Sequence, residues 1–284
     1  MPTFTNQAAI TYGGTTTLSN VVTGELVDVL TVTKQAVGDT YVTGEPVAYV
    51  ISIVNSGTAA ATGVSVTDNL GAYPFGTGTL VPLTYTAGSL LYYVNGETAV
   101  APTPTSTAPL TVEGLTVPAG GSVQLVYTAV PNAYAPLGEG GSITNTVTVD
   151  GGGLISPLTA TETVTAADDG TLNITKSLTP TVVSDGDTVT YTLTVENSST
   201  APVLASGGAI VTDTFDPILS PIAVTFNGTA WTAGTEYTYN PTTGAFATLP
   251  GALTVPAATA QQNPVTGEYT LTPGISTITI TGTV

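Results

Sequence analysis

An internal repeat constrains the fold of this chain more than any other feature. The 284 residues contain only two cationic side chains, Lys34 and Lys176, and these lie 142 residues apart. Three further pairs of identical residues keep the same separation: Gly44 and Gly186, Tyr49 and Tyr191, and Asn55 and Asn197. A fixed offset shared by residues of several types indicates two homologous domains rather than chance similarity.

Both copies carry the alternating pattern of β-strands. Hydrophobic and aromatic side chains recur at every second position, as in Val47, Tyr49, Ile51 and Ile53 and again in Val189, Tyr191, Leu193 and Val195. This period, together with β-branched residues and threonine, is typical of strands, and no segment keeps a helical period. Asn95-Gly96 and Asn227-Gly228 are hairpin-turn signals at corresponding points of the two copies.

Short strands separated by Gly, Pro, Asn and Asp predict an all-β chain with two immunoglobulin-like β-sandwiches in tandem. We assign the first sandwich to residues 25–150 and the second to residues 170–284. A Thr- and Ala-rich linker, 151–169, joins them, and residues 1–24 precede the first sandwich.

Composition excludes several classes of function. Charged residues make up 7% of the chain, against roughly 25% in typical soluble proteins, and the formal net charge is -17. So acidic a chain cannot neutralise a phosphate backbone, which argues against a nucleic-acid partner. It has no Cys and no His, so the commonest metal ligands and general bases are absent and we predict no enzyme activity, cofactor or metal site. No apolar run is long enough for membrane insertion.

The repeated motifs resemble a known class of domain. Each copy contains a Thr-Lys strand, a Gly-Asp/Glu strand that leads to a tyrosine, an Asn-Ser turn and a Val-Thr-Asp strand ending at Asp68 or Asp213. These motifs are similar to the tandem repeat domains of bacterial and archaeal cell-surface proteins. The first copy departs from the pattern with Glu45-Pro46 where the second has Asp187-Thr188. The resemblance implies a surface or stalk role without catalysis.

The second copy is predicted to lack its last strand. The first copy closes with a strand around Asn145, and the 142-residue offset places the equivalent of Asn145 beyond Val284. A matching sequence occurs at the other end of the chain, where residues 4–14 resemble residues 143–152 in order and nearly in spacing. The spacing from Asn6 to Lys34 is also close to that from Asn145 to Lys176.

We therefore expect residues 1–24 to be a donor strand with a glycine hinge. The donor strand is Phe4, Asn6, Ala8, Ile10 and Tyr12, and the hinge is Gly13 and Gly14. Inserted into the second sandwich of a neighbouring subunit, this strand would complete the fold by β-strand addition. A head-to-tail contact of this kind propagates into an open filament. Two alternatives remain: the strand folds back onto its own second sandwich, or it is a disordered tail.

The two lysines resemble the nucleophiles of self-forming isopeptide bonds in the collagen-adhesin and pilin domains of Gram-positive bacteria. That resemblance implies a bond from Lys34 to Asn145 with Asp68 as the catalytic carboxyl. In the second copy it implies Lys176 and Asp213 acting on Asn6 of a neighbouring subunit. The alternative is that each lysine makes only an ion pair with its aspartate.

The sequence thus predicts the structural subunit of an extracellular filament, a pilus, fibre or spore-surface appendage. Its partner is a further copy of the same chain, and no particular anchoring partner is predicted. The N-terminus lacks the basic and apolar regions of a secretory signal, so we expect either prior removal of a signal or release by lysis or sporulation. The alternative function is a monomeric surface stalk or adhesin module that binds a host protein or glycan.

Overall fold

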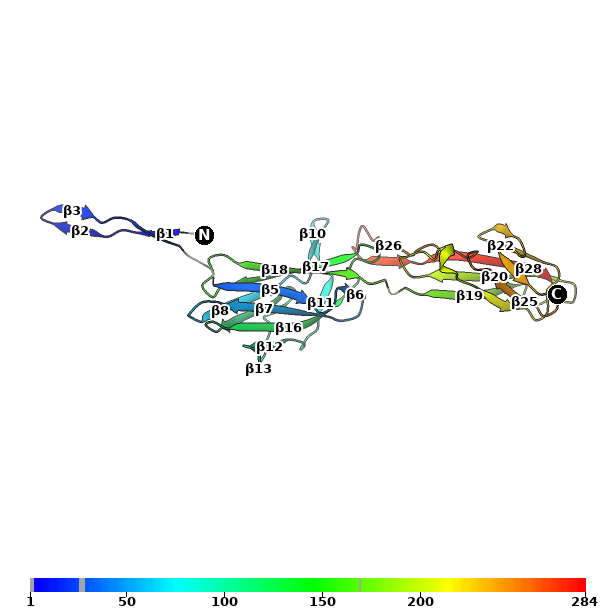
Figure 1. Cartoon of the computed structure of the whole chain (residues 1–284), viewed down its shortest axis with the longest axis horizontal. Helices are drawn as coiled ribbons and strands as arrows, with labels where there is room; N and C mark the ends of the chain where they lie inside the picture. The colour runs from blue at the N-terminus through cyan, green and yellow to red at the C-terminus, as the bar shows by residue number, and fades with distance from the viewer. Residues whose placement is uncertain (1–2, 26–28, 169) are drawn as a thin grey trace. The chain divides into compact units, whose positions relative to one another are not determined.

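The computed structural model describes residues 3–25, 29–168 and 170–284. Its regular structure is almost entirely β-strand, which confirms the all-β prediction (Figure 1). Within the described ranges the only helical element is a single 3-10 turn, η1 (Ala205–Gly207). None of the described helices is long and apolar enough to cross a bilayer. The chain divides into two compact units, Met1–Tyr134 with Ile143–Val164, and Ala135–Ser142 with Thr165–Val284.

The first unit contains a sandwich of two sheets. One sheet has the strand order β13-β12-β16-β7-β5, with β11 also pairing with β16, and the other has the order β14-β15-β8-β17-β18-β6. A small hairpin of β9 and β10 lies outside these sheets. The strands are β5 (Leu30–Ala36), β6 (Thr40–Tyr41), β7 (Val47–Asn55), β8 (Ala61–Asp68), β9 (Tyr73–Phe75), β10 (Gly78–Leu80), β11 (Leu83–Tyr85), β12 (Leu91–Val94), β13 (Glu97–Ala99), β14 (Ser106–Thr107), β15 (Leu110–Val117), β16 (Ser122–Pro131), β17 (Ser142–Asp150) and β18 (Leu158–Ala166).

The second unit repeats this plan with fewer strands. One sheet has the order β19-β20-β28-β22-β23, the other has the order β21-β25-β24, and β26 and β27 form a separate hairpin. The strands are β19 (Leu172–Thr179), β20 (Thr188–Asn197), β21 (Thr212–Thr214), β22 (Ile222–Phe226), β23 (Thr229–Trp231), β24 (Tyr237–Tyr239), β25 (Ala245–Thr248), β26 (Thr259–Gln262), β27 (Tyr269–Thr272) and β28 (Gly274–Thr283).

The alternating pattern sorts core from surface as expected. Along β7 the predicted inner face, Val47, Tyr49, Ile51 and Ile53, is at most 5% exposed. Both predicted hairpin turns are confirmed, since Asn95-Gly96 joins β12 to β13 and Asn227-Gly228 joins β22 to β23. All four turn residues have positive φ, as the tight turn between two twisted strands requires.

The predicted linker, residues 151–169, differs from the structure, because β18 lies within it and joins a sheet of the first sandwich. Only Val164 of this strand is buried, while the remaining side chains are mainly Thr and Ala on a half-exposed strand. A strand with one buried side chain gives almost no hydrophobic periodicity, so the sequence alone suggested a linker. Asp169 lies outside the described residues.

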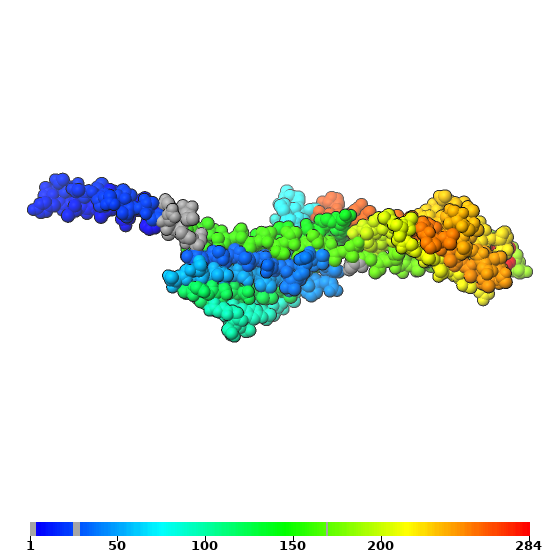
Figure 2. All heavy atoms as spheres, in the orientation of Figure 1, coloured from blue at the N-terminus to red at the C-terminus, as the bar shows by residue number. Residues whose placement is uncertain are grey.

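The N-terminal segment also differs from its prediction, since it is a hairpin rather than a single strand. Strand β1 (Thr3–Asn6) pairs with β4 (Val22–Glu25), and β2 (Ala9–Tyr12) pairs with β3 (Thr15–Leu18). Gly13 and Gly14 form the turn between β2 and β3, both with positive φ, so they are not a hinge between the donor strand and the first sandwich. Figure 2 shows the atoms of the hairpin as a narrow row of dark blue spheres at the N-terminal end of the chain.

Candidate functional site

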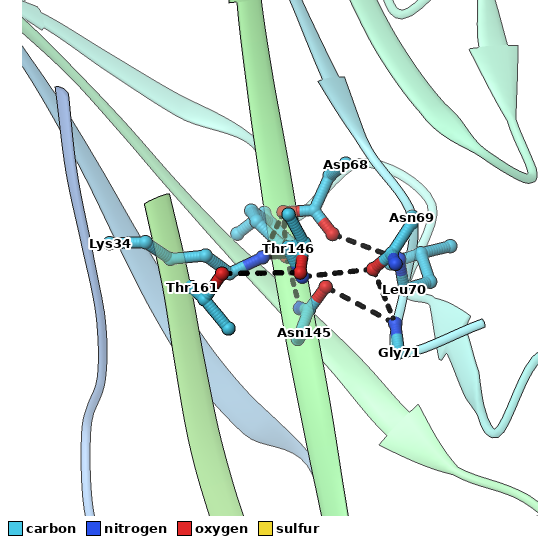
Figure 3. A network of polar contacts seen from close by, with 9 residues as sticks. Lys34, Asp68, Asn69, Leu70, Gly71, Asn145, Thr146 and Thr161 are labelled. Carbon is cyan, nitrogen blue, oxygen red and sulfur yellow. Dashed lines mark hydrogen bonds and ion pairs between the residues drawn. The ribbon is translucent and has the colours of Figure 1, made fainter. Parts of the chain in front are cut away.

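Three polar side chains meet inside the first sandwich. Lys34 comes from β5, Asp68 from the last position of β8 and Asn145 from β17, and their side chains converge in Figure 3. Lys34 is 4% exposed and the other two are fully buried. The structure therefore brings together the three residues that the sequence assigned to one site.

The Asp68 carboxylate is held by three donors. Its Oδ2 atom forms an ion pair with Lys34 and accepts a 2.7 Å hydrogen bond from the hydroxyl of Tyr127. Its Oδ1 atom accepts a 3.0 Å bond from the backbone N–H of Leu70. Burial of a carboxylate is tolerated when it is paired and hydrogen-bonded in this way.

The Asn145 carboxamide is oriented at both ends. Its Oδ1 atom accepts a 3.2 Å hydrogen bond from the backbone N–H of Gly71, and its Nδ2 atom donates a 3.0 Å bond to Tyr127. The carbonyl oxygen thus faces a backbone donor, which polarises the carbon for attack and stabilises negative charge that develops on the oxygen. Tyr127 links the carboxylate and the carboxamide.

Burial lowers the pKa of Lys34 from its usual value of 10.5 to about 8, with nearby Asp68 acting in the opposite direction. The ammonium lies 5.0 Å from the centre of the Tyr49 ring and 5.9 Å from that of Tyr127, so apolar rings replace much of its hydration. The neutral amine, the form that attacks a carbonyl carbon, is therefore accessible near neutral pH.

The lowered pKa predicts a pH dependence of stability in an Asn145→Ala variant, where the amine stays free. Between pH 8 and 10 the folded state has released the Lys34 proton while the unfolded state still binds it. The free energy of unfolding should then rise with pH by up to about 1.4 kcal/mol per unit. Urea titrations at several pH values measure it, and the Asn145→Ala/Lys34→Met variant is the control. Parallel pH profiles for the two variants would contradict the lowered pKa.

Sequence reasoning missed two contributors to this site. Tyr127 lies in the buried register of β16 and is indistinguishable by pattern from a core aromatic residue, while the Gly71 N–H is a backbone group with no side-chain signal. The second sandwich has no hydroxyl at the matching place, since Ile280 pairs with Tyr191 there as Tyr127 pairs with Tyr49.

The second sandwich holds two members of the corresponding site. Lys176 Nζ lies 2.6 Å from Asp213 Oδ2, but the two side chains are 40% and 16% exposed. The ammonium lies over the rings of Tyr191 at 4.5 Å and Phe215 at 5.1 Å. Asn6, the residue assigned to complete this site, lies in β1 opposite Val22.

An apolar hollow lies beside the Lys176 strand. Its volume is about 300 Å³, and it opens next to β21, which is an edge strand in the described sheet. Leu172 at its wall is 47% exposed, whereas the equivalent Leu30 of the first sandwich is 3% exposed. The hollow is lined by Leu172, Asn173, Ile174, Val195, Ala209, Ile210, Val211, Thr212 and Leu253.

The N-terminal hairpin exposes the side chains that the sequence assigned to strand donation. Phe4 is 52%, Ile10 69% and Tyr12 88% exposed, and Asn6 and Ala8 are also exposed. Leu18 and Val22 on the returning strands are more than half exposed as well. The hairpin thus carries apolar side chains with no core of their own.

Comparisons with known proteins give only distant likenesses to solved structures. No family model matches the chain, and no curated protein is similar to it in sequence. It is similar to the collagen adhesin CNA of S. aureus (13% identity, TM-score 0.31), with 55% of each chain covered. It is also similar to the pilus backbone RrgB of Streptococcus pneumoniae (13%, 0.34), with 86% of this chain and 55% of that one covered.

A third structure, the C-terminal fragment of the major pilin GBS80 of Streptococcus agalactiae, matches at 13% identity and a TM-score of 0.34, with 87% and 91% coverage. The chain therefore spans about half the length of the adhesin and of RrgB. All three structures are distant in sequence, and all three TM-scores lie below 0.5.

Proposed function

We propose that this chain is the structural subunit of an extracellular filament that assembles head to tail. The N-terminal hairpin of one subunit completes the second sandwich of the next, and lysine–asparagine amide bonds lock both sandwiches. The proposal is carried by two features that complement each other. The edge strand β21 borders an unfilled apolar hollow, and the exposed N-terminal segment resembles β17 in sequence. No catalytic turnover is involved, because each lysine reacts once.

The first sandwich supplies the template for the subunit junction. There, β8 lies between β15 and β17, whereas in the second sandwich β21 has only β25 beside it among the described strands. In the register of the first sandwich, Val147 pairs with Asp68 and Val149 with Val66. Transferred to the equivalent residues, this register pairs Ala8 of one subunit with Asp213 of the next and Ile10 with Val211. Ile10 then enters the hollow.

The chemistry inside the first sandwich follows from its contacts. Neutral Lys34 Nζ attacks Asn145 Cγ while the Gly71 N–H stabilises the charge on Oδ1. Asp68 takes one proton from Nζ and delivers a proton to Nδ2. The Cγ–Nδ2 bond then breaks, ammonia leaves, and the new Nζ–Cγ amide joins β5 to β17.

The same reaction at the subunit junction joins Lys176 to Asn6 of the neighbouring subunit. Asp213 already lies against the lysine, and the asparagine arrives only with the donor hairpin. Docking also covers the exposed lysine with the incoming hairpin. The covalent step therefore follows docking, which restricts the bond to correctly assembled junctions.

Tyr127 should accelerate the bond in the first sandwich without being required for folding. Its hydroxyl orients the carboxamide and the carboxylate, so Tyr127→Phe should slow bond formation at least several-fold and leave a detectable unlinked population. Intact-mass measurements during refolding report the loss of one ammonia. Tyr85→Phe, which changes a neighbouring ring of the same core, is the control. Equal rates for the two variants would show that the hydroxyl has no role.

Deleting residues 1–25 tests assembly itself. The truncated subunit retains both sandwiches and should remain monomeric at concentrations where the full chain forms filaments, as light scattering and electron microscopy would show. A Gly13→Asn variant keeps a turn sequence suited to the hairpin and should still polymerise. A full chain that stays monomeric and binds a host protein or glycan would instead support a surface stalk or adhesin module.

A further inference from the structure

We propose that the donated element is the closed N-terminal hairpin, with β1–β2 in the position of β17 and β3–β4 in the position of β18. This inference rests on the proposed strand donation and identifies what is donated. A single donated strand would require the hairpin to open first. The hairpin instead supplies counterparts of both β17 and β18, which the described part of the second sandwich lacks.

The N-terminal hairpin and the β17–β18 hairpin of the first sandwich both carry cross-strand threonine pairs on their outer face. In the first sandwich, Thr144 Oγ1 lies 3.1 Å from Thr163 Oγ1, and Thr146 Oγ1 lies 3.3 Å from Thr161 Oγ1. In the N-terminal hairpin, Thr11 Oγ1 lies 2.8 Å from Thr16 Oγ1. Cross-strand threonine pairs of this type stabilise and align paired strands. The N-terminal pairing is thus formed before any partner arrives.

The β17–β18 hairpin and the N-terminal hairpin place different pairs of side chains at the matching position of their inner faces. The threonine pairs of the first sandwich place Ile143 of β17 opposite Val164 of β18, and both are at most 1% exposed. At the matching place in the N-terminal hairpin, Phe4 pairs with Gly24. The Phe4 ring occupies the space above Gly24, where the Cβ of any other residue would collide with it. Phe4 on β1 therefore fills the space that Gly24 leaves on β4. The inner face of the hairpin is complete only when both strands are present.

The outer edge gives a further reason for a two-stranded donor. In the first sandwich, β18 covers the free edge of β17 and pairs on its own far side with β6. The 142-residue offset matches β6 to residues 182–183, which belong to no strand in the described part of the second sandwich. With β3–β4 in place, the open edge of the sheet lies one strand away from β1–β2, which carries Asn6. Keeping the hairpin closed also avoids the cost of ordering the donor on docking.

A reversible staple across the hairpin tests this inference in the full chain. Thr11 and Thr16 are directly paired, and residues so placed lie close enough for a disulfide. The chain contains no Cys, so the Thr11→Cys/Thr16→Cys variant can form only this bridge within one subunit. The variant is refolded at high dilution with either oxidised glutathione or reductant and then concentrated. The reduced protein is the matched control for the oxidised one.

The closed-hairpin donor predicts filaments from the oxidised variant at a rate within about twofold of the reduced variant and the wild type. Light scattering gives the rate, and electron microscopy identifies filaments. A polymerising reduced form with a blocked oxidised form would show that the hairpin must open, which overturns this inference and leaves strand donation standing. Failure of the wild-type chain to polymerise would instead contradict the proposed function itself.

Discussion

Two variants that form no covalent polymer alone are expected to give a covalent dimer when mixed. Asn6→Ala has an inactive donor and an intact acceptor lysine, whereas Lys176→Met has an intact donor and an inactive acceptor. In a mixture, Asn6 of the Lys176→Met subunit can react with Lys176 of the Asn6→Ala subunit, whereas the opposite junction has neither group. On a boiled denaturing gel the covalent product should therefore stop at two subunits. Each variant alone should still form filaments that dissociate on boiling, because the strand pairing and apolar burial remain.

The mixing experiment also separates intermolecular donation from folding back within one chain. A chain that completes its own second sandwich would give no dimer in the mixture. The matched control replaces Gln7, the neighbour of Asn6, by Ala, and this variant should retain the full ladder. Dimers from either variant alone would show that some other pair of groups reacts.

The second large effect is expected in the first sandwich, where Lys34→Met should lower the free energy of unfolding by at least about 4–5 kcal/mol. A bond between Lys34 and Asn145 closes a loop of about 110 residues, and a cross-link of that span stabilises by this amount in the chain-entropy model. Removing the lysine also takes the ion partner from buried Asp68. Urea unfolding followed by circular dichroism measures the change.

The chain offers internal controls for that experiment. Its one tryptophan, Trp231, lies in β23 of the second sandwich, so its fluorescence should report an unchanged transition for that unit. Gln35→Met places the same new side chain at the next, exposed position of β5 and should shift stability by well under about 1 kcal/mol. Equal stability of Lys34→Met and the wild type would exclude an intramolecular cross-link.

The scarcity of lysine would make both proposed reactions specific. No side-chain amine exists apart from Lys34 and Lys176, so neither asparagine meets a competing nucleophile within the chain. Any cross-linked peptide found by mass spectrometry therefore has a single possible lysine for each sandwich. In a chain without Cys, the proposed amide bonds would take the place of disulfides as covalent reinforcement.

Much of the fold could be predicted because the repeat and the strand period are strong signals. The pairs around Tyr49 and Tyr191 located the two sandwiches, and the Asn-Gly turns located two hairpins. The strand β18 was missed because it buries only Val164. For the N-terminal segment the sequence predicts one strand with a hinge, because a Gly-Gly pair suits a flexible joint and a tight turn equally well.

The site was predictable to the extent that its side chains are rare. Lys34, Asp68 and Asn145 stood out by their repeat or by their place in a motif, and the structure brings them together. Tyr127 and the Gly71 N–H could not be found in this way, because a buried tyrosine and a backbone group leave no distinctive pattern. The different exposure of Lys34 and Lys176 likewise depends on which strands surround them.

Mass spectrometry of the bands from a boiled denaturing gel of the wild-type protein tests the central claim most directly. The account predicts a ladder of multimers, in which each junction lacks one ammonia and yields a cross-linked peptide pair that joins Asn6 to Lys176. A single band with the unmodified mass of the chain would contradict covalent head-to-tail assembly.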